Sequence, residues 1–337
     1  MINLNGYYQT PPNLFYQQQT AKLLKAQNEK KEIKYISIVA GLCVIAYIMI
    51  QNLLSILLFM TPLGYIYMND ASMQSVINIF FSFIGLLIPF GIGGVFIGKR
   101  TGTSVFNFGK PVSTSLMLSA VPLGFFVCLA GNYITSSFIN IMDSFGFNLT
   151  APDYDVPSDI PGRIVYAVSI AVVPALVEEF AIRGTVLQPL RKYGDKFAIL
   201  ASSLLFAILH GNLIQAPFAL IAGIVLGYSV CITNSIWTGV LIHFCNNLYS
   251  VFTEFMVADI TNEETLNKVY MITMAMLYAV SILGSVLFII IKKRRKIMPS
   301  FTELTESKKM RAFVLTVPMI IALLFMFSVT SQYVSFE

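Results

Sequence analysis

The chain has 337 residues, of which 56% are hydrophobic and only 12% are charged, and its mean hydropathy is +0.74. A soluble domain of this size cannot bury so much apolar surface, so the composition excludes a water-soluble enzyme, a nucleic-acid-binding domain and a disordered chain. The net charge of +5 is explained by membrane orientation. The composition therefore indicates a multi-pass membrane protein.

Apolar segments recur along the whole chain after a polar start. A membrane-crossing helix needs about 20 consecutive apolar residues. Because the pair of segments between 197 and 233 is short, we predict an all-α transmembrane bundle of about eight or nine spans. In chain order the candidate spans lie near 35–60, 75–98, 113–138, 163–189, 197–213, 215–233, 236–257, 269–291 and 312–330.

The polar start and the apolar remainder define the domain organisation. Residues 1–34 contain five lysines and are interpreted as a cytoplasmic N-terminal tail. No apolar segment follows a short basic start, so no cleavable signal peptide is predicted. Residues 35–330 are interpreted as one transmembrane helical domain, because their longest loops are too short to form a separate soluble domain.

Basic residues alternate between the two sides of the predicted bundle. Cytoplasmic loops of membrane proteins carry an excess of lysine and arginine. If the N-terminus is cytoplasmic, the clusters Lys99–Arg100, Arg191–Lys192 and Lys292–Lys296 are all cytoplasmic, and the external segments carry only Arg163 and Lys268. We therefore predict a protein of the cell membrane with a cytoplasmic N-terminus and an external C-terminus.

Ionisable side chains inside the spans are functional candidates, because a charge at bilayer depth costs at least about 2.5–3.5 kcal/mol. The fourth span contains Glu178, Glu179 and Arg183. Glu179 and Arg183 are four residues apart, so they share a helix face and can pair. Glu178 points about 100° away and has no partner within its helix. One acid is enough to pair Arg183, so the second acid indicates a function.

The chain has only two histidines, His210 and His243, and both lie in apolar segments. His243 and Asn247 are four residues apart and project from one helix face. At about 1.5 Å per residue, Glu178, His210, His243 and Asn247 fall in one layer of the membrane. A buried carboxylate can activate water, a histidine can share the proton, and further N–H groups can bind an oxyanion. The set predicts peptide hydrolysis without a covalent intermediate, since neither G-x-S-x-G nor H-E-x-x-H occurs.

Three short motifs carry a resemblance to a known family. The segment 178–183 has the pattern E-E-x-x-x-R, the segment 206–210 has F-x-x-x-H, and the segment 243–247 has H-x-x-x-N. In this order, within residues 163–252, they resemble the motifs of the CPBP family. That family contains CAAX proteases and bacteriocin-processing enzymes and is also called the Abi or type II CAAX-prenyl endopeptidase family.

The resemblance implies a type II CAAX-protease-like core and an intramembrane glutamic protease that needs no cofactor. It implies that Glu178 activates water with His210 as its partner, and that His243 and Asn247 form an oxyanion hole. The residues that would support this site are Glu179 and Arg183. The expected partners are a peptide or membrane-protein substrate and membrane lipid, with no nucleic acid, and bacterial relatives imply bacteriocin processing or self-immunity.

Two other interpretations use the same residues. A zinc metalloprotease would take Glu178, His210 and His243 as its three ligands, with water as the fourth. A non-catalytic scaffold or immunity protein would keep the motifs for packing alone. Mutation of the motifs and measurement of bound zinc distinguish these alternatives.

Overall fold

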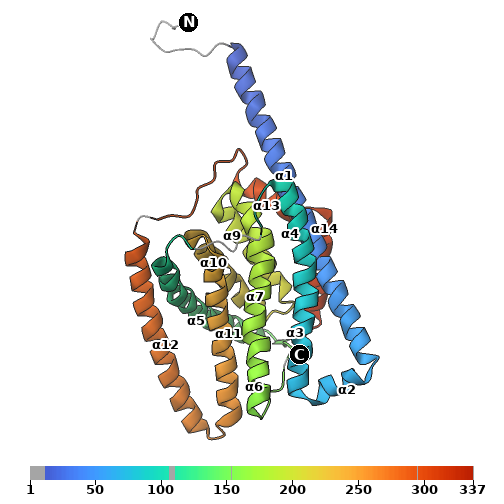
Figure 1. Ribbon diagram of the computed structural model, residues 1–337, viewed down its shortest axis with the longest axis vertical. Helices are drawn as coiled ribbons and strands as arrows, with labels where there is room; N and C mark the ends of the chain where they lie inside the picture. The colour runs from blue at the N-terminus through green and yellow to red at the C-terminus, as the bar shows by residue number, and fades with distance from the viewer. Residues whose placement is uncertain (1–11, 106–110, 153, 294, 337) are drawn as a thin grey trace.

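The computed structural model describes residues 12–105, 111–152, 154–293 and 295–336, and it is almost entirely helical over these ranges (Figure 1). This confirms the predicted all-α, multi-pass helical bundle. Residues 1–11 of the predicted tail and Arg294 of the basic cluster lie outside the described residues.

The helices and strands occur in the following order along the chain. The first half of the chain forms α1 (Pro12–Phe59), α2 (Pro62–Asn69), α3 (Ala71–Ser82), η1 (Phe83–Leu87), α4 (Ile88–Thr101), α5 (Thr114–Ser144), β1 (Phe147–Leu149), α6 (Ile160–Ala167) and η2 (Val168–Val172). The second half forms α7 (Val173–Glu179), η3 (Phe180–Leu187), α8 (Gln188–Leu190), η4 (Arg191–Tyr193), α9 (Asp195–Leu209), α10 (Ala216–Thr233), α11 (Ile236–Asp259), α12 (Glu263–Lys292), α13 (Glu306–Val314), α14 (Val317–Ser331) and β2 (Val334–Phe336).

Helices occupy all nine predicted spans, but not all of them are long and apolar enough to cross a membrane. Within the described residues six helices meet that test, and the pair α13–α14, bent by 72°, makes a seventh if it is counted as one span. Of the other two, α9 has only 15 residues. The second, α11, carries polar residues such as His243, Asn246 and Asn247 along its length. The chain thus places one short helix, α9, and one helix with several polar residues, α11, among long apolar ones.

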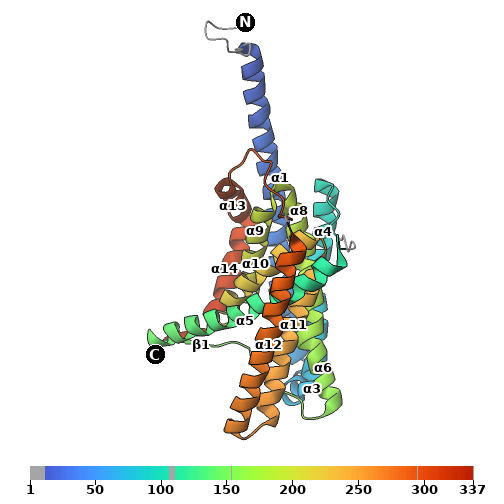
Figure 2. The ribbon, with the colours of Figure 1, turned by 90° about the vertical axis from the view of Figure 1, so that its left-hand side faces the viewer.

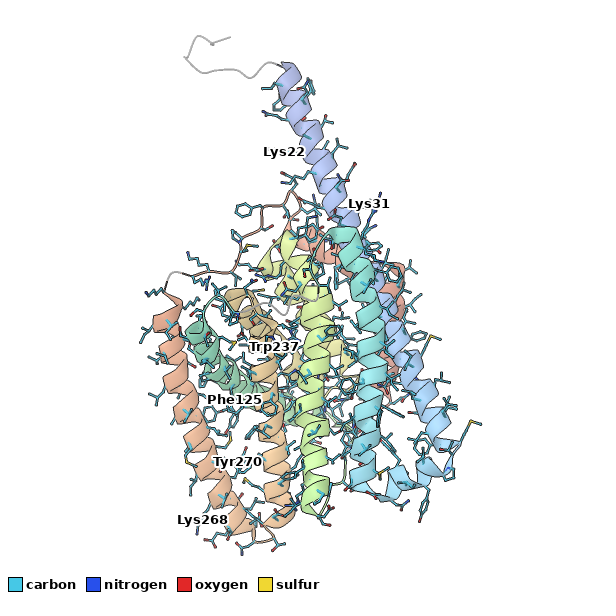
Figure 3. The ribbon with its side chains drawn as sticks, in the orientation of Figure 1. Lys22, Lys31, Phe125, Trp237, Lys268 and Tyr270 are labelled. Carbon is cyan, nitrogen blue, oxygen red and sulfur yellow. The ribbon has the colours of Figure 1, made fainter. Side chains whose placement is uncertain are left out.

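The first helix is much longer than the span predicted at 35–60. It begins at Pro12 and runs for 48 residues, which corresponds to about 70 Å. Its N-terminal part projects beyond the rest of the bundle (Figures 1 and 2). Lys22 and Lys31 lie on this projecting end of the molecule, whereas Lys268 lies at the opposite end (Figure 3). The lysine-rich residues 12–34 are therefore helical and continuous with the first span.

Three segments of the bundle are π-helical, and each ends two residues before a proline. The segments η1, η2 and η3 precede Pro89, Pro174 and Pro189 respectively. Proline has no N–H, and its ring displaces the carbonyl four residues earlier, so the preceding turn widens. The sequence thereby leaves carbonyl groups in the middle of the bundle available to side chains.

The core forms where α7 and η3 pack against α9, α10 and α11, with α1, α4 and α14 around them. The views in Figures 1 and 2 show α6 and α7 stacked end to end along the bundle, while α5 crosses it obliquely. The C-terminal strand β2 pairs antiparallel with β1, with Phe147 opposite Phe336. This pairing ties the end of α14 to the end of α5.

A glycine allows the closest contact between α1 and α14. A Cβ atom at Gly41 would lie 2.6 Å from the backbone nitrogen of Met319, whereas a Cβ at Gly91 would meet nothing closer than a Phe180 ring carbon at 4.0 Å. We expect Gly41→Ala to lower the free energy of unfolding by about 1–3 kcal/mol, because backbone atoms cannot move aside. Gly91→Ala serves as the matched control and should be neutral or stabilising. Thermal unfolding in detergent tests this, and equal melting temperatures for both variants would contradict it.

Candidate functional site

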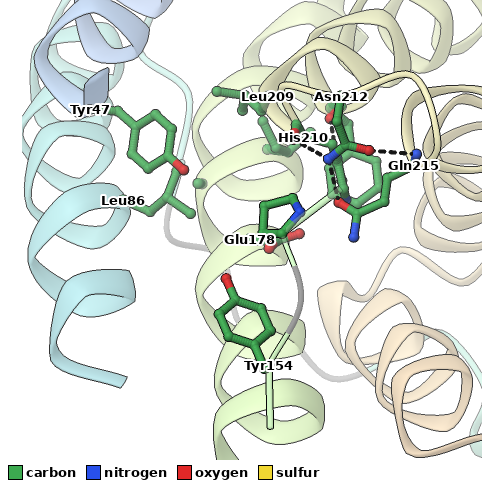
Figure 4. Close-up of a pocket in the computed structure, with 12 residues that line it drawn as sticks. Tyr47, Leu86, Tyr154, Glu178, Leu209, His210, Asn212 and Gln215 are labelled. Atoms are coloured by element: carbon green, nitrogen blue, oxygen red, sulfur yellow. Dashed lines mark hydrogen bonds between the residues drawn. The ribbon is translucent and has the colours of Figure 1, made fainter. Parts of the chain in front are cut away.

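The side chains of Glu178 and His210 line the same cavity, which has a volume of about 290 Å3 (Figure 4). Most of the wall comes from α7 and η3, from α9 and from the segment that follows α9. The described residues that line it are Tyr47, Leu86, Pro152, Tyr154, Glu178, Ala181, Ile182, Phe206, Leu209, His210, Asn212 and Gln215. Glu178 is the only Asp, Glu, Lys or Arg among them.

Glu178 reaches the cavity because of its place on the helix. Ala181 and Ile182, three and four residues further on, line the same cavity and therefore share its helix face. The Glu178 side chain is 24% exposed, so it can be reached by water. The close-up shows it between Tyr154 on one side and His210 and Asn212 on the other, with Tyr47 facing it from α1 (Figure 4).

Glu179 and Arg183 form the ion pair that their spacing predicts. Arg183 Nη1 lies 2.9 Å from Glu179 Oε1, and both side chains are 0% exposed. Arg183 also donates through Nη2 to the Gly223 carbonyl at 3.2 Å, and its guanidinium lies 4.5 Å from the centre of the Phe206 ring. The pair therefore joins three helical segments at the centre of the bundle.

His243 connects the two glutamates. Its Nδ1 lies 3.2 Å from Glu179 Oε1, and its Nε2 lies 3.9 Å from Glu178 Oε2. A carboxylate can only accept a hydrogen bond, so the Nδ1 of His243 is the donor and Nε2 is the nitrogen that faces Glu178. His243 and Glu178 therefore lie close together, as predicted, because α11 packs against α7.

His210 ends α9 and is oriented by its own helix. Its Nδ1 donates to the Phe206 carbonyl at 2.9 Å, which leaves Nε2 available in the cavity wall. The chain then turns at Gly211, whose φ of +66° suits glycine. Asn212 closes this turn, because its amide donates to the His210 carbonyl at 2.9 Å and to Gln215 Oε1 at 3.1 Å.

Asn247 is anchored by one of the carbonyls that a proline sets free. Its Nδ2 donates to the Ile170 carbonyl at 3.1 Å, and Ile170 lies four residues before Pro174 in the π-helical segment η2. Its Oδ1 accepts from Asn246 at 3.2 Å. Neither Asn247 nor His243 is among the cavity-lining residues, so the structure brings Glu178 and His210 to the cavity and leaves these two beside it.

Phe206 organises the histidines, a role that the motif alone does not reveal. Its ring packs edge-on against His210, with ring centres 4.9 Å apart, and against His243, with ring centres 5.7 Å apart. Because Arg183 also lies over this ring, one aromatic side chain separates the buried ion pair from the cavity. The first position of F-x-x-x-H is therefore a packing centre of the site.

Sequence reasoning missed several contributors to this site. A Cβ atom at Gly239 would lie 2.5 Å from Glu179 Oε2, so only glycine leaves room for that carboxylate. Gly239 precedes His243 by four residues, and this spacing was an available signal for a shared face. Tyr47 and Tyr154 line the cavity from α1 and from the segment before α6, and no local pattern marks them.

The three ligands of the zinc alternative are Glu178, His210 and His243. Within the described ranges, no group of three or more His, Cys, Asp or Glu side chains is arranged to hold a metal ion. Glu178, His210 and His243 therefore do not fit a three-ligand zinc site here.

The comparison with family models gives a match to the type II CAAX prenyl endopeptidase Rce1-like family over residues 160–249. The matched segment runs from α6 to α11 and includes the residues that carry all three motifs. No curated protein and no solved structure matches the chain. Over residues 160–249 the chain is therefore similar to the type II CAAX prenyl endopeptidase Rce1-like family, a family of proteases.

Proposed function

We propose that this protein is an intramembrane endopeptidase in which Glu178 activates the attacking water. The observation that carries the proposal is the shared cavity of Glu178 and His210 beside the buried Glu179–Arg183 pair. Among the described residues that line the cavity, Glu178 is the only carboxylate. A carboxylate that meets water in such a site is suited to act as a general base.

The proposed reaction proceeds by addition of water to the peptide carbonyl. Glu178 accepts a proton as the water oxygen attacks, and His210 Nε2 steadies the water or shares its proton. The oxyanion accepts hydrogen bonds from Asn247 and from the Nε2 of His243, which donates when both ring nitrogens of this imidazole carry a proton and Glu179 balances its charge. Asn247 has two N–H groups and uses one on Ile170, so the other is available. Glu178 then returns the proton to the leaving amine.

We propose that the buried pair supports the site and does not take part in proton transfer. Glu179 holds the Nδ1 of His243 at 3.2 Å, which directs Nε2 towards Glu178. Arg183 compensates the charge of Glu179. Hydrogen bonds of catalytic groups often shorten only when substrate is bound, so His243 and Asn247 are expected to approach the cavity in the complex.

The cavity and the membrane setting define the substrate class. Apart from Glu178, the described part of the wall consists of apolar, aromatic and uncharged polar side chains together with His210. Such a wall suits a peptide or membrane-protein segment without charged side chains at the cleavage site. The resemblance to bacteriocin-processing enzymes makes peptide precursors the first substrates to test, with self-immunity as the associated physiological role. We propose that the N-terminus lies in the cytoplasm and the C-terminus outside.

Mass spectrometry of membrane-associated and secreted peptides tests the function. Cells that carry the wild-type protein are compared with cells that carry Glu178→Gln at the same abundance. The expected result is at least one peptide whose new terminus is present only with the wild type, accompanied by accumulation of its precursor in the variant. Identical peptide sets would contradict proteolysis and would favour a non-catalytic scaffold.

Chelation separates the glutamate mechanism from the zinc alternative. We expect the purified protein to contain zinc well below one equivalent and to keep its activity after treatment with a chelator, because the three proposed ligands are not gathered around one point. Elemental analysis and hydrolysis of the identified peptide provide the two measurements. Stoichiometric zinc together with loss of activity on chelation and recovery on zinc addition would overturn the glutamate mechanism.

A further inference from the structure

A second cavity, with a volume of about 460 Å3, is lined by three lysines that the proposed reaction does not use. Lys196 comes from the start of α9, Lys292 from the end of α12, and Lys296 from the segment that follows α12. None of the three has a carboxylate partner among the residues that the structure describes. Among the described residues of the wall the one acid is Glu306, which pairs with Lys309 at 2.7 Å. The cavity therefore carries uncompensated positive charge.

Buried contacts hold the wall of this cavity in place. Asp195 accepts from the backbone N–H of Met298 at 2.7 Å and from Arg191 Nε at 2.8 Å. Ser300 is bound by Lys309 at 2.6 Å. These contacts fasten the segment after α12 onto the start of α9, where it arches over the end of the bundle (Figures 1 and 2). The cavity is thus built before any ligand binds.

An apolar groove of about 600 Å3 continues from the lysines along the outside of the bundle. It shares Lys196, Tyr228 and Ile297 with the basic cavity. Its walls come from α5, α9 and α10, and Leu200 and Ile224 in these walls are 47% and 39% exposed. Both belong to helices that lie within the membrane domain, so the groove faces the acyl chains of the bilayer.

We propose that the lysine cavity and the apolar groove together bind one anionic phospholipid. The phosphate group lies among Lys196, Lys292 and Lys296, and one acyl chain occupies the groove. The Lys292 ammonium lies 5.3 Å from the centre of the Tyr228 ring. Because Tyr228 lines both the lysine cavity and the groove, its ring lies at the boundary between the headgroup and the acyl chain. Basic cavities between membrane helices are suited to anionic headgroups. This site is separate from the cavity of Glu178, and it does not depend on the proposed protease function.

The arrangement favours a lipid over free phosphate or a protein partner. A free phosphate would use the lysines and leave the apolar groove without a ligand. A protein segment would have to enter from within the bilayer to reach Leu200 and Ile224. A phospholipid meets both requirements with one molecule. Its charged headgroup is joined to an acyl chain, just as the lysine cavity continues into the apolar groove.

Lipid binding is tested on the full-length protein in neutral detergent. The melting temperature is followed while phosphatidylglycerol, phosphatidylcholine with the same chains, or inorganic phosphate is added, because a ligand that binds the folded state raises it. Each lysine near a membrane surface contributes roughly a fivefold preference for anionic lipid. The triple variant Lys196→Gln/Lys292→Gln/Lys296→Gln is therefore expected to bind phosphatidylglycerol about 100-fold more weakly.

A matched triple variant controls for net charge. Lys22→Gln/Lys30→Gln/Lys31→Gln removes the same charge from exposed positions on α1 and should leave the affinity for phosphatidylglycerol unchanged. Ile224→Trp keeps all lysines and fills the groove, so it should weaken binding of the lipid but not of inorganic phosphate. Equal losses in both triple variants, equal binding of phosphatidylcholine, or phosphate binding as tight as lipid binding would each overturn the proposal.

Discussion

Glu178→Gln is expected to slow peptide hydrolysis by about 10²–10⁴-fold, the usual contribution of a general base. Glutamine has nearly the same shape as glutamate but cannot accept the proton from water. The side chain lies in the wall of the cavity and is 24% exposed, so the substitution should leave the fold unchanged. Initial rates with a peptide identified in cells, measured in reconstituted vesicles, provide the test.

The control for this experiment is a glutamate at the end of the bundle. Glu264 pairs with Lys268, and its side chain is 77% exposed, so Glu264→Gln should retain the wild-type rate. The melting temperatures of both variants should match that of the wild type. A Glu178→Gln protein that hydrolyses the peptide within a few-fold of the wild-type rate would show that another group activates the water.

Arg183→Met is expected to destabilise the protein by about 3–5 kcal/mol, because it leaves a buried carboxylate without its compensating charge. Glu179 is 0% exposed, and His243 Nδ1 is then its principal polar contact. Methionine fills much of the volume of the arginine side chain. The decrease in the free energy of unfolding therefore comes mainly from the lost charge and its hydrogen bonds and less from lost packing. Thermal unfolding in detergent and the yield of monodisperse protein measure the effect.

A second substitution separates charge from packing in this prediction. Glu179→Gln/Arg183→Met removes both charges and should recover part of the lost stability, because no uncompensated ion remains in the core. Lys268→Met breaks an ion pair whose side chains are 70% and 77% exposed, and such pairs are worth at most about 1 kcal/mol. If Arg183→Met and Lys268→Met had equal effects, the buried pair would not be a structural centre of the site.

Much of this architecture can be predicted from local patterns. The long apolar segments predict the helices, and the four-residue spacing predicts the pairing of Glu179 with Arg183, which the structure confirms at 2.9 Å. Both depend on the local geometry of a single helical segment, in which residues four apart lie on the same side. The break between α13 and α14 within the predicted span 312–330 is also local, because Pro318 cannot continue a helix.

The contacts between helices follow from packing, which no local pattern encodes. His243 meets Glu179 because Gly239 lets α11 approach the carboxylate, and Asn247 reaches Ile170 because Pro174 frees that carbonyl. Tyr47 and Tyr154 complete the cavity from segments far away along the chain. The kinds of side chain and their helical faces are thus properties of the sequence. Whether these side chains meet at one site depends on how closely the helix backbones approach one another. Small residues and prolines throughout the bundle determine that distance.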